Sequence, residues 1–105
     1  MIRVVVEYPN QPGTTFDEAY YLGRHIPLVQ QRLGPLGMVR CEVDKGLAGG
    51  APGAPAPYLF VAHLYFNRLE DLQNAMATHG AEVMGDIPNY TNIQPTIQIG
   101  EIVSS

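Results

Sequence analysis

The pattern of hydrophobic and polar positions along this chain predicts four β-strands. Residues 2–8 (IRVVVEY) are β-branched and aromatic, and they precede the turn sequence PNQPG. In residues 38–46 (MVRCEVDKG) apolar positions alternate with charged ones, which indicates a strand at or near a sheet edge. Residues 58–66 (YLFVAHLYF) are apolar on both alternating faces, so we expect this strand to be covered on both sides. The last strand lies in residues 92–103, where Pro95 cannot donate to a ladder and indicates an edge or a bulge.

A first helix is predicted after the first turn. Thr15 and Glu18 have the spacing of a capping box, in which a hydroxyl and a carboxylate satisfy free backbone N–H groups, so we expect the N-cap at Thr15. Apolar residues recur at helical spacing and predict one buried stripe, and the sequence GPLG ends the helix near Gly34. The stripe consists of Leu22, Ile26, Val29 and Leu33.

A second helix is predicted to begin at Asn67, with Glu70 three residues further on, and to end at Gly80. Its inward side chains are Leu69, Leu72 and Met76. Residues 47–57 (LAGGAPGAPAP) are rich in glycine, alanine and proline and are expected to form an exposed loop.

The predicted order of elements is β-α-β-β-α-β, within a single domain of residues 1–105. This order is typical of an α+β, ferredoxin-like fold, in which a four-stranded antiparallel sheet carries both helices on one face. Two helices leave the second sheet face uncovered, and a large open apolar face is rare on a monomer. We therefore expect a homodimeric α+β barrel, with a lumen beside each sheet.

The middle of the first helix contains an unusual combination of residues. Pro27 has no N–H, so the carbonyl of Gly23 loses its helical donor, and a kink is predicted between these two residues with a free carbonyl beside His25. His25 falls on the flank of the apolar stripe. It is interpreted either as a boundary histidine bonded to a backbone carbonyl or as a general acid/base or ligand anchor.

Other polar side chains are candidates for the same pocket. His63 is a packed core histidine or a second polar anchor, whereas His79 is expected to stabilise the carbonyl end of the second helix. Tyrosine combines an apolar body with a hydrogen-bonding tip, so Tyr21, Tyr65 and Tyr90 are either pocket residues or plain packing. The segment DIPNYTN, Asp86 to Asn92, forms a turn or the rim of a pocket mouth.

Composition and missing motifs exclude several functions. The formal net charge is −4, with 15% charged residues, so no nucleic-acid partner is expected, and neither a signal peptide nor a membrane span is evident. The single cysteine, Cys41, cannot form an intrachain disulfide and is expected to pack in the core. A chain without disulfides is compatible with the reducing cytoplasm, where we expect this protein. Metal-ligand spacings, nucleotide-binding glycine motifs and a serine-hydrolase elbow are absent, so neither a metal nor a cofactor is expected.

The chain resembles the EthD-like family, named for ethyl tert-butyl ether degradation. The resemblance rests on YPNQPGTTFDEAYYLGRHIPLV, GPLG, PYLFVAHLYF and DIPNYTNIQPTIQIGEI, in that order. It implies a dimeric α+β barrel, a group that also includes cofactor-free monooxygenases, lactone isomerases and polyketide cyclases, and a setting of bacterial oxidative degradation. His25 matches the histidine of the helix motif, and Asn89 and Tyr90 match the closing motif.

Two hypotheses of function follow. The first is a cofactor-independent enzyme acting on a small hydrophobic or aromatic oxygenated molecule, with His25 shuttling a proton and tyrosine hydroxyls orienting the substrate. The weakness of this hypothesis is that the sequence shows no second catalytic base beside His25. The second is a non-catalytic binding or accessory protein that supports a partner oxygenase and needs the same cavity. In both, the substrate-binding candidates are Tyr21, His63, Tyr65, Asn89 and Tyr90.

Overall fold

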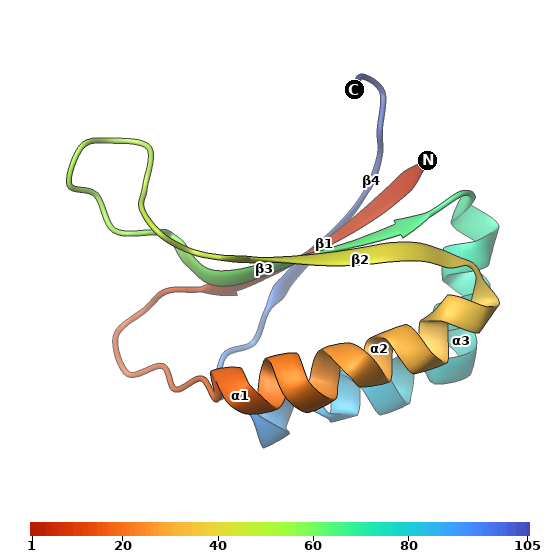
Figure 1. The fold of residues 1–105 in the computed structure, drawn as a ribbon, viewed down its shortest axis with the longest axis horizontal. Helices are drawn as coiled ribbons and strands as arrows, with labels where there is room; N and C mark the ends of the chain where they lie inside the picture. The colour runs from red at the N-terminus through yellow and green to blue at the C-terminus, as the bar shows by residue number, and fades with distance from the viewer.

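The computed structural model describes all 105 residues and places a four-stranded antiparallel sheet against one layer of helices (Figure 1). The strand order is β2-β3-β1-β4, which is the ferredoxin-like arrangement that the sequence predicts. The strands are β1 (Ile2–Pro9), β2 (Met38–Lys45), β3 (Tyr58–Phe66) and β4 (Thr96–Glu101).

The two edge strands are those that the sequence marks as edges. β1 and β3 are central, and Val5 of β1 pairs with His63 on one side and with Gln98 of β4 on the other. Pro95 comes directly before β4, so its missing N–H costs the ladder nothing. β2 lies at the opposite edge, with Arg40, Glu42 and other charged residues exposed.

The first helical segment starts two residues later than predicted. It runs through α1 (Glu18–Tyr20), the π-helical turn η1 (Tyr21–His25) and α2 (Ile26–Leu33), which is followed by the 3-10 turn η2 (Gly34–Leu36). Asp17, rather than Thr15, is the N-cap, because its Oδ1 accepts the Tyr20 N–H at 3.0 Å. Thr15 is instead tied to the far end of the chain, since its N–H donates to Oδ1 of Asn92 at 2.9 Å.

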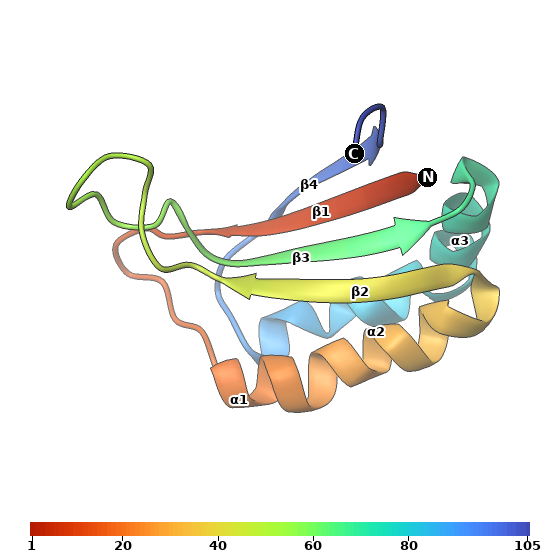
Figure 2. The same ribbon diagram turned by 45° about the horizontal axis from the view of Figure 1, so that its top comes forward.

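The π-turn changes which residues of the helix are buried. The N–H of Ile26 donates to the carbonyl of Tyr21, five residues earlier, and Pro27 follows without an N–H of its own. The sequence predicts an irregularity at Gly23 to Pro27, and the structure has one there in the form of this π-turn, within a helix that runs on from α1 to α2 (Figures 1 and 2). Leu22 was expected in the buried stripe, but it is 46% exposed. The wider turn instead buries Tyr21, His25, Val29 and Leu33.

The second helix is longer than its sequence suggests. α3 spans Leu69–Gly85, so it begins after Asn67 and continues through Gly80, and the 3-10 turn η3 (Ile87–Asn89) follows. Gly80 is buried, and a Cβ there would lie only 3.2 Å from Cε of Met76, so close packing explains the glycine. The prediction for His79 was therefore also wrong, because this residue lies inside the helix, 3.8 Å from Oε1 of Glu82.

The helices and the sheet enclose a core with two parts. One is aliphatic apart from Phe66 and lies around Val4 and Leu33, and the other is mainly aromatic and lies around Tyr8 and Tyr21. Side chains from the inner face of the sheet and from the helical segments build both parts. The Cys41 thiol packs against the aliphatic part, where burial raises its pKa to about 11, and Leu33, Phe66 and Tyr21 are completely buried.

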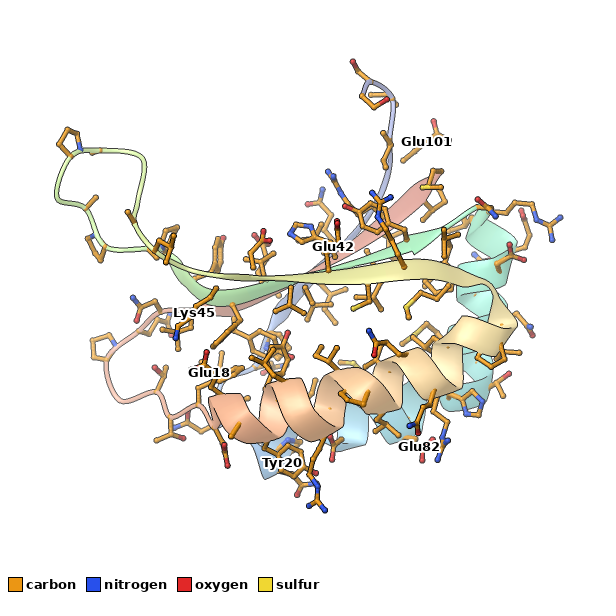
Figure 3. The ribbon with its side chains drawn as sticks, viewed as in Figure 1. Glu18, Tyr20, Glu42, Lys45, Glu82 and Glu101 are labelled. Atoms are coloured by element: carbon orange, nitrogen blue, oxygen red, sulfur yellow. The ribbon has the colours of Figure 1, made fainter.

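The outer face of the sheet has no covering layer in this chain. Figure 3 shows Glu42 pointing from this face, away from the helices. Alternate residues of β3 face outward as predicted: Val61 and His63 are half-buried and Tyr65 is buried. Beyond the end of the sheet, residues 46–57 form an extended loop between β2 and β3 (Figure 2). None of the helices combines the length and the apolar character that crossing a membrane requires.

Candidate functional site

A buried histidine and a carboxylate meet between the two long helical segments. His25 ends the π-turn and is 4% exposed, while Asp86 directly follows the last residue of α3. Nδ1 of His25 lies 2.9 Å from Oδ2 of Asp86. Of the two interpretations of His25, the one that pairs the imidazole with a backbone carbonyl is wrong, because the partner is a carboxylate.

Two further side chains fix the Asp86 carboxylate. Its Oδ1 accepts from the Tyr20 hydroxyl at 2.7 Å and from Nδ2 of Asn89 at 2.9 Å. Tyr20 lies on the side of the helix away from the sheet (Figure 3), so the carboxylate is held from outside the core. Partial burial raises the pKa of Asp86, but the hydrogen bonds from Asn89, Tyr20 and His25 outweigh it and bring the pKa below its usual value.

The ionised carboxylate determines which imidazole nitrogen carries the proton. A carboxylate can only accept, so Nδ1 of His25 donates to Asp86, and in the neutral form of the ring the lone pair is on Nε2. Nε2 has no hydrogen-bond partner in the chain, and the ring lines a cavity between the helices and the sheet. The arrangement is that of a general base with an orienting carboxylate.

Three buried tyrosines lie around this imidazole. The hydroxyls of Tyr8 and Tyr90 are 2.6 Å apart and hydrogen-bonded to each other. The rings of Tyr21 and Tyr90 lie 5.8 and 4.7 Å from the His25 ring, between centroids. Burial raises the pKa of all three phenols above the ordinary value of 10.0, so they remain neutral hydrogen-bond donors at physiological pH.

The hydroxyl of Tyr21 is buried and has no hydrogen-bond partner. The residue as a whole is 0% exposed, so solvent does not satisfy this group. A buried polar group without a partner costs about 1–3 kcal/mol. A ligand oxygen that reached this hydroxyl would supply the missing hydrogen-bond partner.

The cavity beside these groups is small and almost entirely apolar. Its volume is about 40 Å³, whereas an apolar cavity of about 150 Å³ holds a benzene ring. No Asp, Glu, Lys or Arg lines it. The lining residues other than His25, Tyr8 and Tyr21 are Val6, Ile26, Val29, Ala62, Leu64, Val83, Met84 and Ile87.

A larger hollow, of about 640 Å³, lies outside the helices, where Thr15–Asp17 face Pro88–Asn92. It is a wide, shallow cleft. The hydroxyl of Thr91 donates to the carbonyl of Thr15 at 2.6 Å, and Nδ2 of Asn92 donates to the carbonyl of Gly13 at 3.1 Å. These polar groups join two loops and are already paired, so the inner cavity is the better candidate site.

The structure brings only some of the predicted site residues together. Tyr21 and Tyr90 lie against His25, and Asn89 reaches it indirectly, through the Asp86 carboxylate. His63 and Tyr65 lie on the outer face of the sheet instead. Nε2 of His63 is 2.9 Å from Oδ2 of Asp44, and the Arg40 guanidinium lies 4.2 Å from the centre of the Tyr65 ring.

Sequence reasoning missed two members of this cluster. Asp86 belongs to the DIPNYTN segment, which the sequence predicts as a turn or as the rim of a pocket mouth. Its carboxylate is the hydrogen-bond partner of His25, a role that the sequence does not indicate. Tyr8 shares the inner face of β1 with Val4 and Val6, so its two-residue spacing was the signal that could have found it. No three His, Cys, Asp or Glu side chains gather closely enough to hold a metal ion.

Known proteins resemble this chain in sequence and in fold. The EthD domain matches residues 11–94. An EthD-like protein from Ralstonia eutropha JMP134 is 45% identical, with a TM-score of 0.90 over 99% of this chain and 93% of that one. An ethyl tert-butyl ether degradation (EthD) family protein from Bacillus halodurans C-125 is 22% identical, with a TM-score of 0.67 over 96% and 97%.

A more distant likeness extends to the fold alone. SnoaB, a cofactor-independent oxygenase from Streptomyces nogalater, is 8% identical, with a TM-score of 0.67 over 99% of this chain and 94% of that one. No protein with curated annotation matches the sequence.

Proposed function

This chain belongs to the EthD family, and on that premise we propose that it binds a small, oxygen-bearing hydrophobic molecule between its helices and its sheet, with His25 exchanging a proton with the ligand. The observation that carries the proposal is the His25–Asp86 pair. Its free Nε2 belongs to a ring that lines an apolar cavity, beside a buried hydroxyl that lacks a partner.

The chemistry follows from the two groups. Nε2 of His25 accepts a proton from an acidic C–H or O–H of the ligand, and the Asp86 carboxylate stabilises the imidazolium that forms. The Tyr21 hydroxyl donates a hydrogen bond to the ligand oxygen that gains negative charge. Both steps use only side chains of this chain, so the proposal needs neither a metal nor a cofactor.

The comparisons support the class of reaction. The Bacillus halodurans protein is named for ethyl tert-butyl ether degradation, and SnoaB is described as a cofactor-independent oxygenase. We extend these descriptions to this chain as a proposal: a role in bacterial oxidative degradation, on a substrate whose enol or phenol form His25 would deprotonate.

We also propose that a second copy of the chain covers the outer face of the sheet. Charges on this face are unevenly distributed along the strands. At one end, Arg3 and Arg40 pair with Tyr65 from its two sides. At the other end, Glu7 and Asp44 pair in the same way with Val61. A two-fold axis that runs across the strands places each pair of arginines opposite the carboxylates of the other copy.

Light scattering tests this homodimer. The wild-type chain should have the mass of two copies. Replacing Arg3 and Arg40 by glutamate places like charges opposite each other, so the mass should fall to that of one chain. Adding Glu7→Lys and Asp44→Lys to that variant should restore the dimer. A wild-type chain that is monomeric at micromolar concentration contradicts this part of the proposal.

The histidine tests the proposed chemistry. His25→Gln and His25→Ala are to be assayed for binding and turnover of phenols, quinones and lactones, with His79→Gln as a matched control on the outside of α3. The proposal is supported if both His25 variants lose turnover and the His79→Gln control keeps it. Binding by the wild type without any turnover would favour the alternative, a binding or accessory protein. Unchanged turnover in both variants contradicts the role of His25.

A further inference from the structure

A second hollow lies next to the cavity of His25 and is lined only by apolar side chains. Its volume is about 100 Å³, and it follows the inner side of β4, beside α3. Three of its residues are large, apolar and exposed: Met84 at 40%, Ile97 at 45% and Ile99 at 54%. The other lining residues are Val4, Val6, Leu33, Leu64, Leu72, Met76 and Val83. We refer to these ten residues as the β4 groove.

The β4 groove and the inner cavity share part of their walls. Val6, Leu64, Val83 and Met84 line both, so the two hollows are neighbours. Val6 and Leu64 belong to the sheet, and Val83 is 7% exposed. Met84 is different, because it lies at the surface on the last turn of α3 and has an unbranched, flexible side chain. Rotation of this one side chain is therefore the easiest way to join the two hollows.

The lining of the two hollows limits the charge of a ligand. Neither hollow is lined by Asp, Glu, Lys or Arg, and the only nearby ionised partner of His25 is the carboxylate of Asp86. A carboxylate or phosphate buried there would find no Lys or Arg to pair with, and the charge of a protonated His25 is already paired with Asp86. A buried charge without a partner of its own is strongly unfavourable. Size gives a second limit, because the inner cavity of about 40 Å³ is too small for a ring by itself.

Resting on the proposed function, we infer that the ligand is uncharged and has two parts: an oxygen atom that enters the inner cavity beside His25 and Tyr21, and an alkyl substituent in the β4 groove. A ring that carries the oxygen lies where the two hollows meet, because the inner cavity alone is too small for it. Met84 moves aside to connect the two hollows. Alkyl-substituted phenols and similar enols have this form. The exposed Ile97 and Ile99 then serve as a binding surface for the alkyl group, at the open side of the groove.

Methionine methyl groups report on this inference directly. The chain has four methionines, of which Met76 and Met84 line the groove, while Met38 on β2 does not. With [¹³C-methyl]methionine labelling, NMR titration uses phenol, 4-methylphenol, 4-butylphenol and 4-hydroxybenzoate as probes. The Met84 and Met76 signals should move with 4-butylphenol much more than with phenol, whereas the Met38 signal should stay in place.

Affinity should depend on chain length and on charge. Each added methylene should tighten binding by about fourfold or less, as expected for burial of one CH₂. The charged 4-hydroxybenzoate should bind more weakly than 4-methylphenol. Ile99→Lys should remove the dependence on chain length without removing phenol binding, and Leu47→Lys, in the exposed loop, is the matched control.

The outcomes separate this inference from the proposed function. If phenol and 4-butylphenol bind with equal affinity and leave the Met84 signal unchanged, the inference is overturned while the role of His25 stands. If none of the probes binds, both fall. If the Met84 signal responds to dilution of the protein and not to the probes, a second copy covers the β4 groove, and this too overturns the inference.

Discussion

Nδ1 of His25 lies 2.9 Å from Oδ2 of Asp86, although the two residues are 61 positions apart in the chain. The first comes from a π-turn in the first helical segment and the second from the end of α3. This contact joins the two halves of the fold at the point where a cavity, a free imidazole nitrogen and an unpartnered hydroxyl meet.

Asp86→Asn should reverse the protonation of the His25 ring. Tyr20 and Asn89 donate to Oδ1, so the amide oxygen should take that position and the NH2 group should face Nδ1. Nδ1 then accepts, and in the neutral ring Nε2 carries the proton. The ¹⁵N chemical shifts of the ring should show this exchange, and turnover should fall by about a hundredfold or more, the usual contribution of a general base. In Asp44→Asn, which alters only the partner of His63, the His25 signals should not change.

Acid should destabilise the fold partly through Asp86. Its pKa in the folded protein is lower than the ordinary 3.8, so its contribution to stability is complete above that value. The contribution is lost as the pH falls through the lower, folded pKa. Urea midpoints between pH 6 and pH 2 should therefore drop less steeply for Asp86→Asn than for the wild type. Equal slopes for the two proteins would show that the carboxylate contributes nothing to acid unfolding.

Tyr21→Phe should stabilise the ligand-free protein by about 1 kcal/mol, because it removes a buried hydroxyl that has no partner. Tyr90→Phe is the matched control. It breaks the hydroxyl pair with Tyr8, so it should lower the free energy of unfolding by about 1 kcal/mol. Denaturant unfolding measures both. Tyr21→Phe should also weaken the binding of phenols, and a variant that is less stable yet binds normally would contradict the assigned role.

Leu22→Lys should be tolerated, within about 0.5 kcal/mol of the wild-type stability, because Leu22 is 46% exposed. Val29, assigned to the same stripe by the sequence pattern, is 3% exposed. Val29→Lys should therefore prevent folding, and the milder Val29→Ala should cost at least about 1 kcal/mol. Thermal and urea unfolding of the three variants distinguish the π-turn from a regular helix, in which Leu22 and Val29 would be equally sensitive.

These residues also show how far the sequence could predict the fold. Alternating and continuous apolar runs define the four strands, and Pro95 marks the edge strand, because these properties depend on neighbours in the chain. The helix register could not be found in the same way. A projection at 3.6 residues per turn assumes regular hydrogen bonds, and the bond from Ile26 to Tyr21 breaks that assumption.

The candidate site was predictable only in part, for a related reason. His25, Tyr21 and Tyr90 are found from side-chain chemistry. The position of Asp86 depends on α3 continuing through Gly80, which the low helix propensity of glycine does not predict, whereas buried residues on both sides of it, Ala75 and Val83, pack this part of α3 into the core. A helix that ended at Gly80 would give no reason to place the Asp86 carboxylate beside the first helix.

The exposed loop of residues 46–57 separates the chain into two segments, each with part of the reactive pair. The N-terminal segment carries the imidazole and the C-terminal segment its carboxylate. Neither segment alone contains the His25–Asp86 pair, so the candidate site forms only when the two segments pack together. Cleavage within the loop would therefore give two fragments that each lack the site, and the site would form again only on their reassociation.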